Sequence, residues 1–245
     1  METRLNEVDS RVLARPVLDL LDLTSEDDIA AAEKAYVDRY HPAYVLCKVQ
    51  IEDLTLIHQM EEAGFRFVET QLRLTFRLSK PFDVPEGPYL FERVVRRDAL
   101  EDVLAIVRET FTDDRWLIDP WFTDARGLSG KRYEAYVRQS FERPDERVYR
   151  LLERQSGRTL AMRTHRHLGN GGALMLLGGV HPDYKCAGLA PLMSFHEYNE
   201  LLRQGITQIT THVSARNYAI LNLEMSALKY RVVQTFVVLR KVYST

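Results

Sequence analysis

The sequence has few cysteines, no long apolar run and no excess of charge of one sign. Its two cysteines, Cys47 and Cys186, lie far apart, so neither a disulfide framework nor a Cys-rich zinc site is expected. No run of about 18 apolar residues occurs, and no apolar stretch follows the N-terminal charges, which argues against a membrane span and a signal peptide. We therefore expect a protein of the reducing cytoplasm.

The charge balance is close to neutral. The 33 basic and 35 acidic side chains give a net charge of -2, so no overall field favours nucleic acid or an anionic membrane. Any anion site must be local. With 45% hydrophobic and 28% charged residues, 12 glycines and 9 prolines, the chain has the composition of a globular protein with a real core. Its 245 residues suffice for one large domain, or for an ordinary domain with an addition.

A proline-rich segment divides the chain. Residues 79–88 contain three prolines and a glycine, which prevent a regular element from continuing. We therefore predict a small N-terminal α/β part, 1–88, and a larger part, 89–245. In the first part, helical spacing follows the acidic start signal at 25–28, and a strand (44–49), a helix (51–63) and a long strand (65–78) come next.

The second part alternates strand-like and helix-like runs. The patterns predict strands at 90–96, 147–154, 159–167, 173–180, 206–213 and 231–242, and helices from 98, at about 129–142, 188–204 and 218–228. This mixture predicts an α/β fold with helices on both faces of a sheet. The long apolar strand near the C-terminus is one candidate for an exposed sheet edge.

The two parts share a short internal similarity. Residues 65–74 align without gaps on 230–239, with identical Arg, Val, Thr and Leu at four positions, and each segment follows a strand and a helix. Ten residues are compatible with a structural repeat and also with two long strands in similar environments.

The most informative segment runs from Leu177 to Ala190, Leu-Gly-Gly-Val-His-Pro-Asp-Tyr-Lys-Cys-Ala-Gly-Leu-Ala. A strand leads through a turn into a loop of small residues that opens a helix. Backbone N–H groups at such a helix start can hold a phosphate or pyrophosphate, and Lys185 adds positive charge. The alternative is a tight connection without a ligand.

This segment resembles the acyl-CoA-binding motif of the GNAT acyltransferases, Val-x-Pro-x-Tyr followed by a loop with Gly and a small residue. Val213–Leu223, with Asn217, resembles the second hallmark of that superfamily. The resemblance covers 89–243 and implies a mixed, mostly antiparallel sheet flanked by helices, with acetyl-CoA or another short acyl-CoA as cosubstrate and no metal. The cofactor-binding residues that it implies are Gly178, Gly179, Val180, Lys185, Cys186, Ala187, Gly188, Leu189, Ala190 and Asn217.

A narrower resemblance concerns the acceptor. Residues 44–74 and the run Phe111-Thr-Asp-Asp-Arg-Trp-Leu-Ile-Asp-Pro120 are similar to the TDP-fucosamine acetyltransferases, which carry a small N-terminal domain. This similarity implies that Arg115, Asp119 and Phe122 border the acceptor pocket. The alternative is a loop that only packs through its apolar residues.

The chain departs from the GNAT pattern where catalysis needs an acid. Seven residues after Asn217, many relatives have a tyrosine that protonates the CoA thiolate, whereas this chain has Glu224. A carboxyl can act there only if burial raises its pKa. One extra residue also precedes Leu228-Lys-Tyr230, where relatives have Leu-Gly-Phe. Lys185 and Cys186 replace a usual Arg or Gln and a common glycine.

Other proton-transfer groups compete with Glu224. His212 lies on a strand beside the expected divergence point and is either a general base or a hydrogen-bonded strand histidine. Tyr218 and Tyr230 flank the position of the missing tyrosine, and either is a substitute. His165 and His167 share a strand face, for which a polar sheet face is a better explanation than a metal pair.

The resemblance favours an N-acetyltransferase that moves a short acyl group to a primary amine by direct attack in a ternary complex. Its catalytic candidates are Glu224, Asn217 and His212. The alternatives are a non-catalytic acyl-CoA sensor and an enzyme for amino acids, polyamines or antibiotic amines. The expected partners are a small-molecule amine and, as in many relatives, a second copy of the chain.

Overall fold

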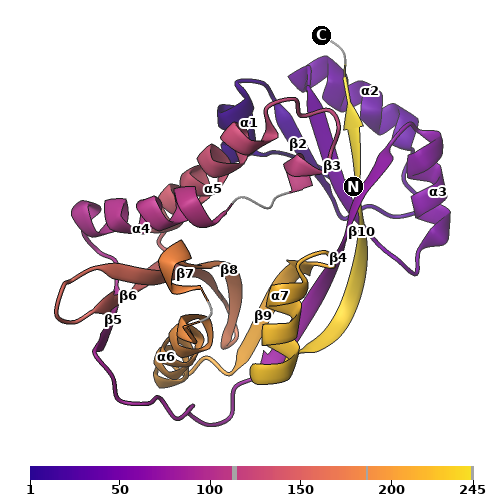
Figure 1. Ribbon diagram of the computed structural model, residues 1–245. Helices are drawn as coiled ribbons and strands as arrows, with labels where there is room; N and C mark the ends of the chain where they lie inside the picture. Colours follow the sequence, from indigo (N-terminus) through magenta and orange to yellow (C-terminus); the bar gives the residue numbers. More distant parts are fainter. Residues whose placement is uncertain (112–114, 186, 244–245) are drawn as a thin grey trace.

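The protein forms one ten-stranded sheet covered by helices on both faces (Figure 1). This computed structural model describes residues 1–111, 115–185 and 187–243. The strands are β1 (Glu2–Leu5), β2 (Val17–Leu21), β3 (Tyr44–Gln50), β4 (Arg66–Arg77), β5 (Tyr89–Arg93), β6 (Glu146–Glu153), β7 (Thr159–Leu168), β8 (Gly172–Val180), β9 (Gln208–Ser214) and β10 (Arg231–Val242). The helices are α1 (Glu7–Leu13), α2 (Ile29–Tyr40), α3 (Leu54–Glu62), α4 (Arg97–Thr110), α5 (Ala125–Glu142), α6 (Leu189–Arg203) and α7 (Tyr218–Asn222).

The strand order in the sheet is β1-β2-β3-β10-β4-β9-β8-β7-β6-β5. Among the strands of the described residues, only β2–β3 and β8–β9 pair in parallel, and the other neighbours are antiparallel. The predicted mixed and mostly antiparallel α/β sheet is therefore confirmed. Among the described residues, no helix is both long and apolar enough to cross a lipid bilayer.

The helices cover two faces with different partners. α4 and α5 pack on β6–β8 through Val148, Met162 and Leu177, and α1 and α5 lie on the same face beside β2 and β3. On the opposite face, α6 and α7 cover β4, β8 and β9, and α2 and α3 cover β2, β3 and β10. Each face therefore has a core in both halves of the sheet.

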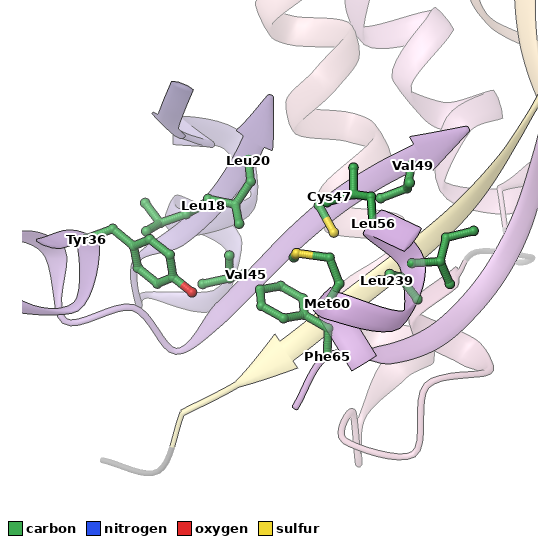
Figure 2. Close-up of a cluster of buried hydrophobic side chains, with 11 residues drawn as sticks. Leu18, Leu20, Tyr36, Val45, Cys47, Val49, Leu56, Met60, Phe65 and Leu239 are labelled. Atoms are coloured by element: carbon green, nitrogen blue, oxygen red, sulfur yellow. The ribbon is translucent and has the colours of Figure 1, made fainter. Parts of the chain in front are cut away.

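The core under α2 and α3 shows how the N-terminal half is held together (Figure 2). Asp28 and Asp53 cap the two helices by accepting hydrogen bonds from Ala31 N and Leu56 N at 3.0 Å. The apolar residues of α3 then face alternate residues of β3, so that Met60 is fully buried beside Val45 and Cys47. Leu239 of β10 completes this cluster, although it lies at the other end of the chain.

The last strand is central, so the expectation of an exposed edge is wrong. β10 lies between β3 and β4, and β4 lies between β10 and β9 (Figure 1). Each half of the chain thus contributes a long strand that pairs with a strand of the other half. Val238 and Leu239 are fully buried on opposite faces of β10, which explains the apolar run there.

The register of β4 and β10 shows that the internal similarity is a structural repeat. We match residues 65–74 with 230–239. Under this match, the cross-strand pair Arg231–Thr75 takes the place of the cross-strand pair Arg240–Arg66, and the two members of the pair Phe236–Gln71 exchange places. The two register shifts bypass Val68 and Val233, which are matched valines. A local two-fold axis through the pair Phe236–Gln71 therefore relates the two long strands.

The same axis relates the two parallel strand pairs. β2–β3 runs from Val17–Tyr44 to Leu20–Cys47, and β8–β9 runs from Gly172–Gln208 to Met175–Thr211. β3 and β9 occupy matched positions, because each pairs antiparallel with β10 or β4 in the same register. Both parallel pairs stop after four residues on each strand, at equivalent points.

The extra residue before Leu228 is absorbed by a π-helical turn. Asp53 caps α3 and Asn217 caps α7 at matched positions, but Phe65 and Tyr230 are matched one residue later. The π-helical turn Leu223–Ala227 accommodates this residue between the cap and the strand. Lys229 then adopts φ +62° at the position of Gly64, which has φ +88°.

Candidate active site

The candidate site begins where β8 and β9 diverge. They pair in parallel as far as Met175–Thr211, and from there to Val180 β8 pairs with β7 on its other side. Among the described strands, none pairs with the β9-facing edge of residues 176–180. The backbone N–H and C=O groups on that edge can therefore bind an extended ligand between the strands.

Glycines let the side chains of neighbouring elements pack closely against both faces of this strand edge. A Cβ on Gly179 would lie 3.0 Å from Phe111 Cε2 and 3.3 Å from Thr110 Cγ2, and one on Gly178 would lie 3.3 Å from Arg163 Cγ. The Thr110 hydroxyl donates to Val180 O at 3.1 Å, which fixes the end of β8 against α4. Gly178 itself is exposed to solvent.

The loop from β8 to α6 ends at an uncapped helix start. Gly188, with φ +74°, is the N-cap residue of α6, and among the described residues no side chain caps this helix. α4 and α5 also begin without a side-chain cap, whereas α1, α2, α3 and α7 are capped by Asn6, Asp28, Asp53 and Asn217. A helix start of this kind is suited to an anion.

The predicted cofactor residues of this loop differ in exposure. Lys185, Ala187 and Gly188 are exposed, whereas the Leu189 side chain is buried in the core under α6. Cys186 lies outside the described residues. Sequence reasoning missed Arg158, whose Nη2 lies 2.9 Å from Asp183 Oδ2 and whose guanidinium lies 5.2 Å from the Tyr184 ring centre. Arg158 therefore lies against the loop as one half of an ion pair with Asp183.

Asn217 is held as the cap of α7. Its side-chain oxygen accepts a hydrogen bond from Ile220 N at 3.2 Å, and the residue is exposed at the end of β9. Its backbone places α7 directly after the diverging strand.

Glu224 lies in a buried polar cluster under α6 and α7. It is 4% exposed, and its Oε1 lies 3.9 Å from Arg163 Nη2. Its Oε2 has no hydrogen-bond partner. Burial raises the pKa of Glu224, Arg163 opposes the rise, and Glu197 adds to it. Because Arg163 Nε is also 3.0 Å from Glu197 Oε2, one guanidinium faces two carboxylates.

Arg163 connects this cluster to the diverging strand. It pairs across the sheet with Gly178, and its side chain runs along that glycine toward α6. Glu224 is thereby on the α6 and α7 face of the strand edge, one side chain away from Gly178.

The other candidates beside Glu224 have partners of their own. Tyr230 is 3% exposed, its hydroxyl lies 2.7 Å from Tyr198 Oη, and burial raises its pKa well above the usual value. Tyr218 is 71% exposed. His165 Nδ1 lies 2.8 Å from Glu197 Oε1, and His167 stacks on His165. Within the described ranges, no group of three or more metal-ligating side chains occurs.

His212 lies on the opposite face, which α4 and α5 share. Its neighbours Thr211 and Val213 are buried toward the other side, whereas His212 is exposed beside the Phe236 ring, at 6.2 Å between ring centres. Partial desolvation and the positive charges of Lys48 and Arg73 lower the pKa of His212 to about 4. The imidazole is therefore neutral at pH 7.

Lys48 is a second group on this face, and sequence reasoning missed it. It occupies the position in β3 that His212 occupies in β9, and its Nζ donates to Gln71 Oε1 at 2.7 Å. It has exposed surface, yet desolvation is the main cause that lowers its pKa to about 8. Both observations fit an ammonium group in the wall of a cavity.

The three predicted acceptor residues lie in one turn of the chain, but their side chains have different surroundings. Arg115 lines a cavity in the N-terminal half, with its Nε 3.5 Å from Glu69 Oε1. Asp119 is buried, accepts two hydrogen bonds from Arg240 at 2.8 and 3.0 Å, and accepts one from Tyr44 Oη at 2.7 Å. Phe122 stacks on Trp116 in the core. Arg240 holds the pKa of Asp119 below its usual value, although burial opposes this effect.

Comparisons with solved structures identify the fold. The chain is similar to a GCN5-related N-acetyltransferase from Sphaerobacter thermophilus, with a TM-score of 0.66 and 16% identity over 98% of this chain and 76% of that one. A tandem GNAT protein from the clavulanic acid biosynthesis pathway gives a TM-score of 0.65 and 12% identity, over 95% and 77% of the two chains. A GCN5-related N-acetyltransferase from Kribbella flavida gives 0.62 and 16%, over 94% and 82%.

These likenesses show that the chain has the GNAT fold. No protein-family model matches it, and no curated protein matches it either.

Proposed function

We propose that the protein is an acyl-CoA-dependent N-acyltransferase. The observation that carries this proposal is the unpaired edge of β8 that leads directly into the uncapped start of α6. The edge is suited to an extended amide-containing arm, and the helix start is suited to a pyrophosphate. Lys185 supplies nearby positive charge. Acetyl-CoA, the expected cosubstrate, combines these two chemical features and brings the activated acyl group.

Acyl transfer makes three demands on the protein. The acceptor amine must lose a proton, the carbonyl oxygen needs a hydrogen-bond donor as its charge develops, and the departing sulfur needs a proton. Backbone N–H groups near Gly179 and Val180 are the candidates for the second role, because they lie at the diverging edge. Alignment of the two substrates supplies a further large part of the rate.

Glu224 is our candidate for the acid. Its buried carboxyl competes with Glu197 for Arg163, so the neutral form is favoured at a pH where an exposed glutamate would be ionised. A neutral carboxyl has a proton to donate. The adjacent phenol Tyr230 is a weaker acid, because burial raises its pKa and its hydroxyl contacts Tyr198.

His212 is our candidate for positioning the amine or the water that deprotonates it. At neutral pH, its uncharged ring can accept a hydrogen bond. It lies on the face opposite Glu224, so that acid and acceptor side are separated by the sheet. The acceptor is a primary amine, and the resemblance of 44–74 and 111–120 makes a nucleotide-linked amino sugar the first candidate to test.

The test compares two glycines at opposite ends of α6. Gly188 and Gly205 both have positive φ, +74° and +78°, and a Cβ at either would meet no atom within 4 Å. Gly188→Glu places a negative carboxylate at the helix start, whereas Gly205→Glu places it beyond the helix end. We expect Gly188→Glu to abolish acetyl-CoA binding in calorimetry and Gly205→Glu to retain it. Equal affinity of both variants would refute the site.

Transfer is tested separately from binding. The protein is mixed with acetyl-CoA and a panel of amines, amino-sugar nucleotides first, and free thiol is measured with and without each amine. Thiol release that depends on an amine is expected. Tight CoA binding without transfer to any amine would instead favour an acyl-CoA sensor.

A further inference from the structure

The N-terminal half contains a polar cavity at the counterpart of the proposed acyl-CoA site. Its volume is about 340 Å³, within the range of about 300–1,000 Å³ that is usual for small-molecule sites. It lies beside the ends of β2 and β3, where these strands stop pairing, on the face of α1 and α5. The lining includes Asn6, Asp19, Lys48, Arg115, Arg132 and Tyr136.

The cavity lacks the features of the first site that suit a pyrophosphate. The connection from β2 to α2 contains Asp22, Glu26, Asp27 and Asp28, where the connection from β8 to α6 has Lys185 and small residues. Asp28 also caps α2 through Ala31 N. A pyrophosphate at this helix start would face carboxylates and would have to compete with an existing cap. The two-fold relation therefore does not extend to the ligand.

The cavity wall contains four basic side chains, Arg4, Lys48, Arg115 and Arg132, and three acidic ones, Asp9, Asp19 and Asp22. Arg132 forms a buried bidentate pair with Asp9, at 2.8 and 3.1 Å. Arg4 pairs with Asp19 at 3.3 Å, and Arg115 faces Glu69 at 3.5 Å. Among the described residues, no carboxylate lies within ion-pair distance of Lys48, whose partner is the neutral Gln71.

The cavity is electrostatically connected to the proposed transfer site. Lys48 lies on the same sheet face as His212, and its charge helps to lower the pKa of His212. Gln71, the partner of Lys48, lies on β4 beside β9 and pairs in register with Ser214, two residues after His212.

We propose that this cavity binds an anionic group, a carboxylate or a phosphate, of the amine acceptor, with Lys48 and Arg115 as its cationic contacts. This assignment rests on the proposed function, because it names the class of acceptor. The two halves then divide the work: the C-terminal half binds the acyl donor, and the N-terminal half recognises the charged end of the acceptor.

The charge of Lys48 gives the cavity a pH dependence. Desolvation lowers the pKa of this lysine to about 8, Arg115 and Arg132 contribute in the same direction, and Asp19 and Glu69 oppose it. The ammonium form is therefore present below pH 8 and is lost as the pH rises through 8. Anion affinity should fall about tenfold between pH 7 and pH 9. Arginine keeps its charge over this range.

The experiment measures anion binding by the full-length protein without any transfer step. Acetate and inorganic phosphate are the two probes, and the protein is first saturated with CoA so that the α6 loop is filled. NMR chemical shifts follow binding in the wild type, Lys48→Met, Lys48→Arg and the exposed-lysine control Lys34→Met. Acetate keeps its charge between pH 7 and 9, so the pH dependence of acetate binding reports on the protein alone. The probe that binds more tightly shows whether the site prefers a carboxylate or a phosphate.

We expect Lys48→Met to weaken probe binding about 10- to 100-fold, as for loss of a charged hydrogen bond. Lys34→Met should have no effect, and Lys48→Arg should bind equally at pH 7 and 9. Because no carboxylate among the described residues pairs with Lys48, Lys48→Met should not lower the melting temperature. Probe binding that is unchanged in Lys48→Met would overturn the assignment, and so would binding of a second equivalent of CoA in the wild type.

The outcomes separate this inference from the proposed function. Probe binding that depends on Lys48, in a protein that transfers no acyl group, would refute the transferase and keep the anion site. Acyl transfer with equal KM for neutral and anionic amines, unchanged in Lys48→Met, would keep the transferase and refute the anion site.

Discussion

Replacement of Glu224 by methionine should stabilise the protein and impair catalysis. The two-fold relation places Glu224 at the position of Met60, which is fully buried in the matching core (Figure 2). Methionine therefore fits this position in the same backbone frame, apart from the π-helical turn. Glu224 has a carboxyl oxygen without a partner, and a buried unsatisfied polar group costs about 1–3 kcal/mol. We expect Glu224→Met to raise the free energy of unfolding by about this amount at pH 8.

The pH dependence identifies the carboxyl as the cause. The pKa of Glu224 is raised in the folded state. The neutral carboxyl therefore contributes stability below the usual glutamate pKa. This contribution is lost as the pH rises through the folded-state pKa. Each unit of pKa shift corresponds to about 1.4 kcal/mol. The advantage of Glu224→Met over the wild type should therefore be larger at pH 8 than at pH 5.

Urea unfolding at pH 5 and pH 8, followed by tryptophan fluorescence, measures this difference. Glu224→Gln is the matched control, since it keeps the shape and removes the titration. A pH-independent difference, or a Met variant less stable than the wild type at both pH values, would show that Arg163 fully compensates the charge and would refute the reasoning. Glu224→Gln should also lower kcat about 10²-fold. A wild-type rate in both variants would remove Glu224 from the mechanism.

Two further predictions concern the repeat. Lys229→Gly should raise the free energy of unfolding by up to about 1 kcal/mol in urea titrations, because φ +62° is strained for lysine, and the reciprocal Gly64→Lys should lower it. An unchanged midpoint in both variants would contradict this account. Removal of residues 231–245 should leave no cooperative unfolding transition by circular dichroism, because both β3 and β4 lose a central partner, whereas removal of residues 1–5 should leave the transition intact. A folded protein without β10 would contradict the observed pairing.

Elements with a strong local pattern were predictable from the sequence. The bounds of β10 are those predicted, and β3, β4 and β8 differ by one or two residues, because long apolar or alternating runs between glycines or prolines define them locally. The first 21 residues gave no prediction. There, α1 has seven residues and depends on the pair between Asp9 and Arg132, a residue far away in the sequence.

The position of β10 in the sheet was not predictable from its own residues. An apolar strand at the end of a chain looks the same whether it lies at an edge or in the centre, and pairing with β3 and β4 decides which. The same limit applies to the π-helical turn. The sequence shows one residue too many before Leu228, and only the fixed ends at Asn217 and Tyr230 determine how the chain absorbs it.

Some residues of the candidate site were predictable from the sequence and others were not. The segment from Gly178 to Ala190 is continuous, so its pattern was visible in the sequence. Lys48 was not, because a single lysine in an alternating strand reads as a solvent-facing residue. Its role depends on Gln71 and Arg115, which approach it only in the fold.

The comparison of the two halves shows how the two proposed sites differ. Both halves have a short parallel strand pair, a capped helix after the inner strand and a long strand exchanged with the other half. This shared frame sets where the two proposed sites lie, but it does not choose their ligands. We attribute the difference in ligand to a few differences at equivalent positions. At the helix starts, Gly188 of α6 leaves the helix uncapped, whereas Asp28 caps α2. On the inner strands, β9 has His212 where β3 has Lys48. An exchange of function between the halves would therefore require changes to the loops and to single strand residues, and not to the sheet.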